Sequence, residues 1–489
     1  MASIDRTRKR TSQFDDPNSP PKKRPSFTSY LQTPNLSPKI KLLCEILANV
    51  PSPTVEKSLE ETGVRVTAED VEQVLKLSYS FPGPTVKFFR WAGHQLNDNH
   101  SPYAWNLVVD LLGKNSLFEA MWDAIKSMKN EGLLSLATFA SVFSSYVVSD
   151  RVDEAIMTFE VMDQYGCARD VVGLNSLLSA ICREGKTCRA KEFLDIAKSK
   201  IRPDRDTYAI VLEGWENEGN GVEAEKTFGE MVNYCGWDPL NVPAYDAFLN
   251  TLLKGRDGIH DAMKFFDVMK EKRCYPGLKF FKSALDEIVK AKNSRVACSL
   301  WDSMVRNNMC RPDTQMYNSI ISLQCSLHRD DVARELFDEM VFNGAFPDSH
   351  TYNVLIQVML KIRKLSEVSA LFSEMVKNEC IPDFSNCVTA ITVYLDVGDS
   401  SMAIKVWKCL VANEPPLDGL ETTGNKLVNG LRDLNMLPEA RKYAEDMIDM
   451  GVKLNSSTLS KLKHDLSKLG KSAVYDDLLK KWKSNSSSH

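Results

Sequence analysis

From about residue 102 to about residue 455, the sequence repeats itself every 34 to 37 residues. Residues 138–170 and 316–348 are two of the clearest copies, and residues 351–383 follow directly as a third. A fixed period of this length is typical of a stacked array of small structural repeats. Each repeat in such an array contacts mainly its neighbours, so one core and one long surface extend along the chain. We therefore expect function to reside on a long surface rather than in a single cleft.

Each repeat contains two helical stretches, and the second stretch carries a stripe of apolar side chains. Ala155, Phe159 and Met162 form one stripe, and their offsets of four and seven residues place them on one helical face. The alanine lets two helix backbones approach closely, while the larger side chains fill the space against the next repeat. We expect these residues to form the core and to bind no cofactor.

The array has a distinct segment at each end. Residues 1–40 are rich in Pro, Ser, Lys and Arg and are predicted to be a disordered basic segment. Residues 41–101 are predicted to form an N-terminal helical cap with a degenerate repeat, and residues 456–489 a C-terminal helical cap with a polar tail. The ten repeats in residues 102–455 begin near residues 102, 136, 171, 205, 242, 278, 314, 349, 384 and 421.

Composition limits the classes of partner. The 489 residues carry a formal net charge of −4, so the protein as a whole is not basic. A polyanion would therefore have to bind a local stripe of basic residues. No run of 18 apolar residues is present, so we expect no membrane span. Twelve cysteines without a C-x-x-C pair favour reduced thiols in an intracellular compartment over disulfides or a zinc site.

The repeat signature resembles that of the pentatricopeptide repeat family. Thr351-Tyr352-Asn353 stands near the start of one repeat, the A-x3-F-x2-M stripe stands in the second stretch, and Pro347-Asp348 ends the preceding repeat. The resemblance is to the P subfamily of plant organellar proteins, and it implies an all-α fold, a right-handed superhelical α-solenoid. It also implies a non-enzymatic protein that binds single-stranded RNA at about one base per repeat. An H-x-E motif with a downstream C-x-x-C, the deaminase signature, is absent from the sequence.

The resemblance further implies that the fifth and last residues of each repeat read one base together. Five pairs carry polar residues that match this pattern: Asn106 with Ser135, Asn175 with Asp204, Asn318 with Asp348, Asn353 with Asp383, and Asn425 with Asn455. By resemblance, the Asn–Asp pairs favour uracil, and the other two pairs favour pyrimidines, with a leaning to cytosine. The remaining pairs depart from the pattern: Ala140 with Asp170, Ala209 with Asn241, Asp246 with Gly277, Lys282 with Asp313, and Val388 with Leu420. These departures favour the alternative function, a protein-interaction scaffold without base-specific RNA reading.

A cation recurs at the thirteenth residue of five repeats, near the end of the first helical stretch. These residues are Lys114, Arg183, Lys254, Lys290 and Lys361. At one register they would line a groove and neutralise phosphates. The alternative is that each cation only complements the dipole at a helix C-terminus.

These patterns predict a monomer that binds single-stranded RNA, with other RNA-processing proteins as further partners and no metal or cofactor. The predicted role is post-transcriptional, in the stability, processing or translation of organellar RNA. We predict mitochondrial localisation from the family resemblance. Basic clusters at residues 8–10 and 22–24 favour the nucleus as the alternative, and a plastid is a third location.

Overall fold

The computed structural model describes residues 27–306, 310–413, 417–468, 470 and 472–486. The regular elements of these residues are 26 α-helices and three short 3-10 helices, so the expected all-α repeat fold is confirmed. The chain divides into two compact bodies, one ending at Gly236 and the other beginning at Trp237. None of the helices described is long and apolar enough to cross a membrane.

The N-terminal cap begins earlier than the sequence predicts. Its elements are η1 (Tyr30–Gln32), α1 (Pro38–Asn49), η2 (Ser52–Thr54), α2 (Val55–Glu61), α3 (Ala68–Leu77) and α4 (Pro82–Gln95). The prediction of disorder for residues 1–40 is therefore wrong for residues 27–40, and residues 1–26 lie outside the described residues. The physical reason is local, because Ser37 accepts a hydrogen bond from the N–H of Ile40 and Pro38 suits the first helical position. Phe27 also packs on the ring of Tyr79, with ring centroids 5.4 Å apart.

Each repeat is a pair of helices. The first helices are α5 (Pro102–Lys114), α7 (Leu136–Val148), α9 (Val171–Arg183), α11 (Arg205–Glu218), α13 (Val242–Leu253), α15 (Leu278–Lys290), α17 (Thr314–Ser326), α19 (Ser349–Lys361), α21 (Phe384–Asp396) and α23 (Leu417–Asp433). The second helices are α6 (Phe118–Asn130), α8 (Val152–Val161) with η3 (Met162–Tyr165), α10 (Thr187–Ala197), α12 (Gly221–Cys235), α14 (Gly258–Glu271), α16 (Ser294–Arg306), α18 (Asp330–Phe342), α20 (Leu365–Lys377), α22 (Ser400–Ala412) and α24 (Leu437–Asp449). Two further helices, α25 (Ser456–Lys468) and α26 (Ser472–Ser486), follow the tenth repeat.

One repeat start differs from the prediction. Helix α23 begins at Leu417, four residues before the expected start at 421. Two prolines precede it in the sequence, and proline ends one helix while its fixed φ angle suits the start of the next. The repeat register is unaffected, because Asn425 of α23 makes the same backbone contacts as Asn353 of α19.

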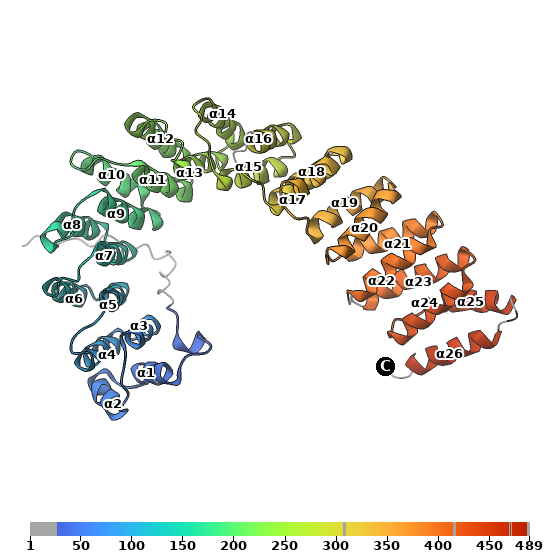
Figure 1. Ribbon diagram of the computed structural model, residues 1–489, viewed down its shortest axis with the longest axis horizontal. Helices are drawn as coiled ribbons and strands as arrows, with labels where there is room; N and C mark the ends of the chain where they lie inside the picture. The colour runs from blue at the N-terminus through green and yellow to red at the C-terminus, as the bar shows by residue number, and fades with distance from the viewer. Residues whose placement is uncertain (1–26, 307–309, 414–416, 469, 471, 487–489) are drawn as a thin grey trace, which may run out of the picture. The chain divides into compact units, whose positions relative to one another are not determined.

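The first helices pack in one layer and the second helices in another. In the N-terminal body, α5 contacts α7, α7 contacts α9 and α9 contacts α11, while α6, α8, α10 and α12 lie on the other side of this layer (Figure 1). In the C-terminal body, the series from α13 to α25 packs in the same way through consecutive odd-numbered helices. A face built from the same register of successive first helices therefore runs along each body.

The predicted stripes form the core. Ala155, Phe159 and Met162 are 0%, 3% and 1% exposed, and the equivalent residues of the other repeats are similarly buried. The ring of Phe159 contacts the rings of Phe143 and Phe193, with centroids 6.4 and 5.9 Å away, so it joins its own repeat to the next one. Full burial of such a side chain contributes about 1.5–3 kcal/mol, which makes these stripes the main source of cohesion between repeats.

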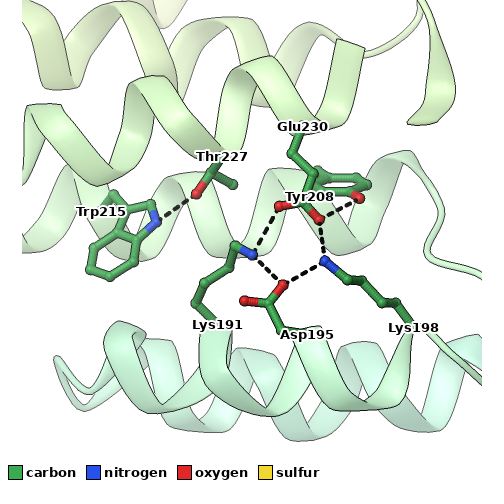
Figure 2. Close-up of polar contacts among 7 residues, drawn as sticks. All are labelled: Lys191, Asp195, Lys198, Tyr208, Trp215, Thr227 and Glu230. Carbon is green, nitrogen blue, oxygen red and sulfur yellow. Dashed lines mark hydrogen bonds and ion pairs between the residues drawn. The ribbon is translucent and has the colours of Figure 1, made fainter. Parts of the chain in front are cut away.

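Polar contacts tie the second helices to one another in the N-terminal body. Figure 2 shows Glu230 of α12 facing two lysines of the preceding repeat, Lys191 at 2.9 Å and Lys198 at 3.1 Å. Asp195 pairs with the same lysines at 2.5 and 2.8 Å. Burial disfavours the charged form of Glu230, but the two lysines outweigh it and lower the pKa of this carboxyl group. The alternating charges fix α12 against α10.

A tyrosine in the fourth position of three first helices ties each helix pair together. Its hydroxyl donates to a glutamate 22 residues later in the second helix, over 3.3, 3.0 and 3.1 Å. These pairs are Tyr208 with Glu230, Tyr317 with Glu339, and Tyr352 with Glu374. The tyrosine ring is fully buried in each case, so the polar contact fixes the rotation of a first helix about its axis. That rotation determines which residues the helix presents on its opposite side.

Candidate nucleic-acid interface

The last residue of a repeat stands directly before the next first helix, which gives it a structural role. Asp170, Asp204, Asp313 and Asp348 are N-cap residues, and each accepts a hydrogen bond from the backbone N–H three residues later. Such a cap satisfies a helix N–H that has no partner within the helix. The capping geometry also fixes where each carboxylate lies relative to the fifth residue of the preceding first helix.

Asn175 and Asp204, the fifth and last residues of one repeat, contact each other next to the start of the following repeat. Asn175 Nδ2 donates to Asp204 Oδ1 over 3.1 Å. Thr207, the third residue of the next first helix, donates from its hydroxyl to Asn175 Oδ1 over 2.7 Å, and its backbone N–H donates to Asp204 Oδ1 over 2.8 Å. The threonine thus holds the amide and the carboxylate against each other. We call this arrangement an amide–carboxylate pair.

Asn318 and Asp348 form the second amide–carboxylate pair. Asn318 Nδ2 lies 3.1 and 3.2 Å from the two carboxylate oxygens, and Thr351 donates to Asn318 Oδ1 over 2.5 Å. Both oxygens belong to one carboxylate on one side of the amide, so they share one N–H. In each pair, the contacts of the amide with the described residues leave its second N–H for a ligand.

The carboxylates of both pairs are ionised at neutral pH. Burial opposes ionisation, but the backbone N–H of the capping threonine and the asparagine amide outweigh it, so the pKa values of Asp204 and Asp348 are lowered. An ionised carboxylate only accepts hydrogen bonds. Each amide–carboxylate pair therefore presents one fixed donor beside one fixed acceptor.

Asn353 and Asn425 bind the backbone instead. Asn353 Nδ2 donates to the carbonyls of Ser349 and Ile381 over 2.7 and 3.0 Å, and Asn353 Oδ1 accepts from the backbone N–H of Asp383 over 2.7 Å. Both amide protons are then in use. The Asp383 side chain is exposed and makes no cap hydrogen bond. The predicted partners are adjacent, but their side chains form no amide–carboxylate pair.

Asn425 repeats this arrangement in the tenth repeat. Its Nδ2 donates to the carbonyls of Glu421 and Lys453 over 2.7 and 3.1 Å, and its Oδ1 accepts from the N–H of Asn455 over 3.0 Å. Asn425 is only 4% exposed. We call this arrangement, in Asn353 and Asn425, a backbone-bound asparagine. It leaves the amide no N–H for a base.

The first predicted pair, Asn106 with Ser135, shares only part of the arrangement of the amide–carboxylate pairs. Asn106 Oδ1 accepts from the hydroxyl of Thr138 over 2.7 Å, as in the amide–carboxylate pairs. Ser135 replaces the aspartate, and its backbone N–H donates to the hydroxyl of Thr138 over 3.3 Å. The structure therefore brings Asn106 and Ser135 together through Thr138 but supplies no carboxylate.

In two of the pairs that depart from the pattern, the two residues bind each other, which we call a closed contact. Lys282 Nζ lies 2.5 Å from Asp313 Oδ2, and Asp246 Oδ1 accepts from the N–H of Gly277 over 2.6 Å. Burial opposes ionisation of Asp313, but Lys282 and the N–H of Met316 lower its pKa. A sequence comparison with the repeat pattern marks these positions as unusual, but it does not reveal that the two residues of each pair bind each other.

The five predicted phosphate-binding cations differ in their surroundings. Lys114 contacts Asp110 at 2.7 Å and Lys290 contacts Glu287 at 2.6 Å, both within their own helices. Lys254 is exposed at the residue after α13. Arg183 and Lys361 are exposed at the ends of α9 and α19, and neither makes an ion pair with the residues that the structure describes. These last two are the cations most available to a phosphate.

The described part of the chain contains no group of three or more His, Cys, Asp or Glu side chains that could hold a metal ion. The twelve cysteines are all free thiols, most of them buried or half-buried. Burial raises the pKa of Cys182, Cys325 and Cys387 to about 12, which keeps these thiols protonated and unreactive.

Family models match along both bodies. The PPR repeat family model matches residues 312–361 and 347–385, the pentatricopeptide repeat domain model matches residues 157–217, and the PPR repeat model matches residues 103–133 and 137–167. The chain is a pentatricopeptide repeat protein. All the matched models are models of the repeat itself, which is consistent with the P subfamily.

The relatives of this pentatricopeptide repeat protein include two mitochondrial pentatricopeptide repeat-containing proteins of Arabidopsis thaliana. One is 30% identical over 207 residues, which cover 42% of this chain and 40% of the relative. The other is 26% identical over 295 residues, which cover 60% of this chain and 51% of the relative. The chain thus spans about half the length, or less, of these curated relatives.

Two solved structures are also similar. The pentatricopeptide repeat protein PPR10, in complex with an 18-nt psaJ RNA element, is 20% identical with a TM-score of 0.41, and the match covers 90% of this chain and 67% of PPR10. Yeast Rmd9p in complex with a 16-nt target RNA is 12% identical with a TM-score of 0.38, and the match covers 92% of this chain and 96% of Rmd9p.

Proposed function

We propose that this pentatricopeptide repeat protein binds single-stranded RNA along the face formed by its first helices, without enzymatic activity. The observation that carries the proposal is the amide–carboxylate pair, which recurs at the same register in Asn175–Asp204 and Asn318–Asp348. Asparagine is a poor helix former, and each of these amides keeps an N–H that none of the residues described by the structure uses. A repeated, oriented and unused donor is what a base-reading surface requires.

The chemistry of the pair favours uracil. The unused N–H of the asparagine can donate to a carbonyl oxygen of the base, while the carboxylate can accept from the ring N–H of the base. Because Thr207 and Thr351 hold these groups in place, little conformational entropy is lost when a base binds. Arg183 and Lys361 would neutralise phosphates between the bases.

The proposed role is post-transcriptional action on mitochondrial RNA, through RNA stability, processing or translation. The location is supported by the mitochondrial relatives. A fluorescent fusion with and without residues 1–27 tests it. Import into mitochondria that depends on these residues is expected, and accumulation of the full-length fusion in the nucleus would contradict the mitochondrial role.

Selection from a random RNA pool tests RNA binding directly. The selected RNAs should contain uracils at fixed spacing, and Asn318→Ala should weaken binding roughly tenfold to these RNAs but little to RNAs without the corresponding uracil. Lys361→Ala should weaken binding to every sequence and reduce the slope of affinity against salt by about one. Lys408→Ala is the matched control, because Lys408 is an exposed lysine on the second helix α22. Equal losses on all RNAs from Asn318→Ala would remove the base-reading role.

The alternative is a protein-interaction scaffold, and one observation favours it. The closed contacts of Asp246 with Gly277 and of Lys282 with Asp313 occupy the reading positions of two adjacent repeats. The same selection separates the two functions, because a scaffold without base-specific reading would enrich no RNA above a scrambled pool.

A further inference from the structure

A polar groove lies at the C-terminal end of the array, where α21, α23 and α25 meet. Its volume is about 520 Å³, and its lining includes Thr392 from α21, Glu421, Lys426 and Asn429 from α23, and Lys461 from α25. The first helices α21 and α23 and the following helix α25 pack in series in the same body and contribute to it, so it lies on the face proposed to bind RNA. Leu395 closes against Gly430 in this groove, where a Cβ atom on the glycine would come within 2.7 Å of the leucine side chain.

The asparagine expected to read a base in this groove already uses its hydrogen-bonding groups on the protein backbone. Asn425 lines the groove, but its amide donates to two backbone carbonyls and its oxygen accepts from the N–H of Asn455. It is therefore a backbone-bound asparagine that fixes the start of α25. Another group has to interact with a base at this position, if one binds.

Asn429 is placed one helical turn after Asn425 and has an unused acceptor. Its Nδ2 donates to the backbone carbonyl of Asn425 over 2.8 Å and to the hydroxyl of Thr458 over 2.9 Å. The carbonyl can only accept, so this contact fixes which end of the amide is the nitrogen. Asn429 Oδ1 is buried and has no hydrogen-bond partner among the described residues. A buried acceptor without a donor is destabilising, and a donor supplied by a ligand would remove that cost.

We propose that Asn429, instead of Asn425, reads the base bound by the last repeat, and that this base presents an exocyclic amine, as adenine or cytosine does. The proposal rests on the RNA-binding function proposed above. Asn429 Oδ1 accepts from the amine, and the carboxylates of Glu421 and Asp433 in the same groove disfavour a base that presents only a carbonyl there.

The two lysines of the groove suit the flanking phosphates. Lys426 and Lys461 are the sixth residues of successive repeats if α25 is counted from Ser456, so they repeat with the period of the array. Both are exposed, and neither makes an ion pair within the part of the chain that the structure describes. Their positions on α23 and α25 place a cation on each side of the site, one repeat apart.

The experiment removes the amine from the RNA rather than only changing the protein. An RNA selected by the wild-type protein is resynthesised with one adenosine at a time replaced by purine ribonucleoside, or one cytidine by 2-pyrimidinone ribonucleoside, which lack the amine. At one position near an end of the bound RNA, the wild-type protein should lose roughly tenfold in affinity. Asn429→Ala should show less than about a twofold difference between the same two RNAs.

A matched variant separates loss of the Asn429 acceptor from a folding defect caused by the Asn429→Ala substitution. Thr458→Val removes the hydroxyl that binds Asn429 Nδ2 but leaves Asn429 Oδ1 in place, so the roughly tenfold sensitivity to the amine should persist. If RNA binds but no position couples to Asn429, the reading role of Asn429 is wrong while the proposed RNA binding stands. If no RNA is enriched by the wild-type protein, both proposals fail.

Discussion

Asn318 and Asn353 stand in adjacent repeats, each with an aspartate as the last residue of its repeat, yet their amides make different contacts. Asn318 bonds to the carboxylate of Asp348, whereas Asn353 bonds to three backbone groups, the carbonyls of Ser349 and Ile381 and the N–H of Asp383. The same two residue types at the same register therefore give one group with a free donor and one without. Residue identity at the two reading positions does not by itself establish that a repeat can read a base.

Where the last residue of the repeat is an aspartate, the third residue of the following helix accounts for the difference. Thr351 donates to Asn318 Oδ1 and turns the amide nitrogen towards the carboxylate, and Thr138 and Thr207 bind the preceding asparagine in the same way. Asn386 takes this position after Asn353, and its Nδ2 donates to both oxygens of Asn353 over 2.8 and 3.2 Å. The Asn353 amide is then drawn to the backbone. Thr458 holds this position after Asn425, but the last residue there is Asn455, and Asn425 is backbone-bound.

The largest difference between the two arrangements should appear in stability. Asn425→Ala leaves the carbonyl of Lys453 and the N–H of Asn455 without their partner, at a cost of about 3 kcal/mol. Asn318→Ala removes contacts to a carboxylate that stays solvated, at a cost of about 1 kcal/mol. Hydrogen exchange of the amides around residues 453–458 measures the first effect, and exchange around residues 348–353 measures the second. Equal losses of protection would show that the two arrangements are energetically the same.

A change of the third residue should convert one arrangement into the other. In the Asn386→Thr variant, the new hydroxyl is expected to hold Asn353 against Asp383, which would add a preference for uracil of roughly fivefold at that position. Affinities for paired RNAs that differ only at this nucleotide check the gain. Asn386→Val has a similar shape without the hydroxyl and should give no gain. A gain from both variants would mean that loss of Asn386, rather than the threonine hydroxyl, releases the amide.

The smallest effect should be a dependence of stability on pH. The lowered pKa of Asp348 means that its ionised form is favoured in the folded state, so this stabilisation is present above the ordinary carboxyl pKa of about 3.9 and disappears as the pH falls below it. Solvent screens the exposed carboxylate, so the effect should remain below about 1 kcal/mol. Urea unfolding at pH 6 and at pH 3.5 measures it, with Asp348→Asn as the comparison. A variant that loses as much stability on acidification as the wild type would exclude this contribution.

Much of the fold is predictable from the sequence because it depends on contacts with a short period. The apolar stripe predicts the buried face of the second helices, and an aspartate before a helix start predicts the N-caps found at Asp204 and Asp348. The extension of α23 to Leu417 and the ordered segment before α1 are local exceptions. The unused acceptor of Asn429 gives no signal in the sequence, because its oxygen is unpartnered only through the packing of α25 on α23.

The sequence by itself determined the array: the period, the helix pairs, the core and the register of the candidate reading positions. Those features depend on residues within one repeat or on a pattern that every repeat shares. The tertiary structure alone decided which asparagines keep a free donor, because their partners lie 28 to 33 residues away, at the end of the same repeat or at the start of the next. An amide can satisfy itself with a carboxylate, a hydroxyl or the backbone, and only the packed neighbours determine which of these it meets.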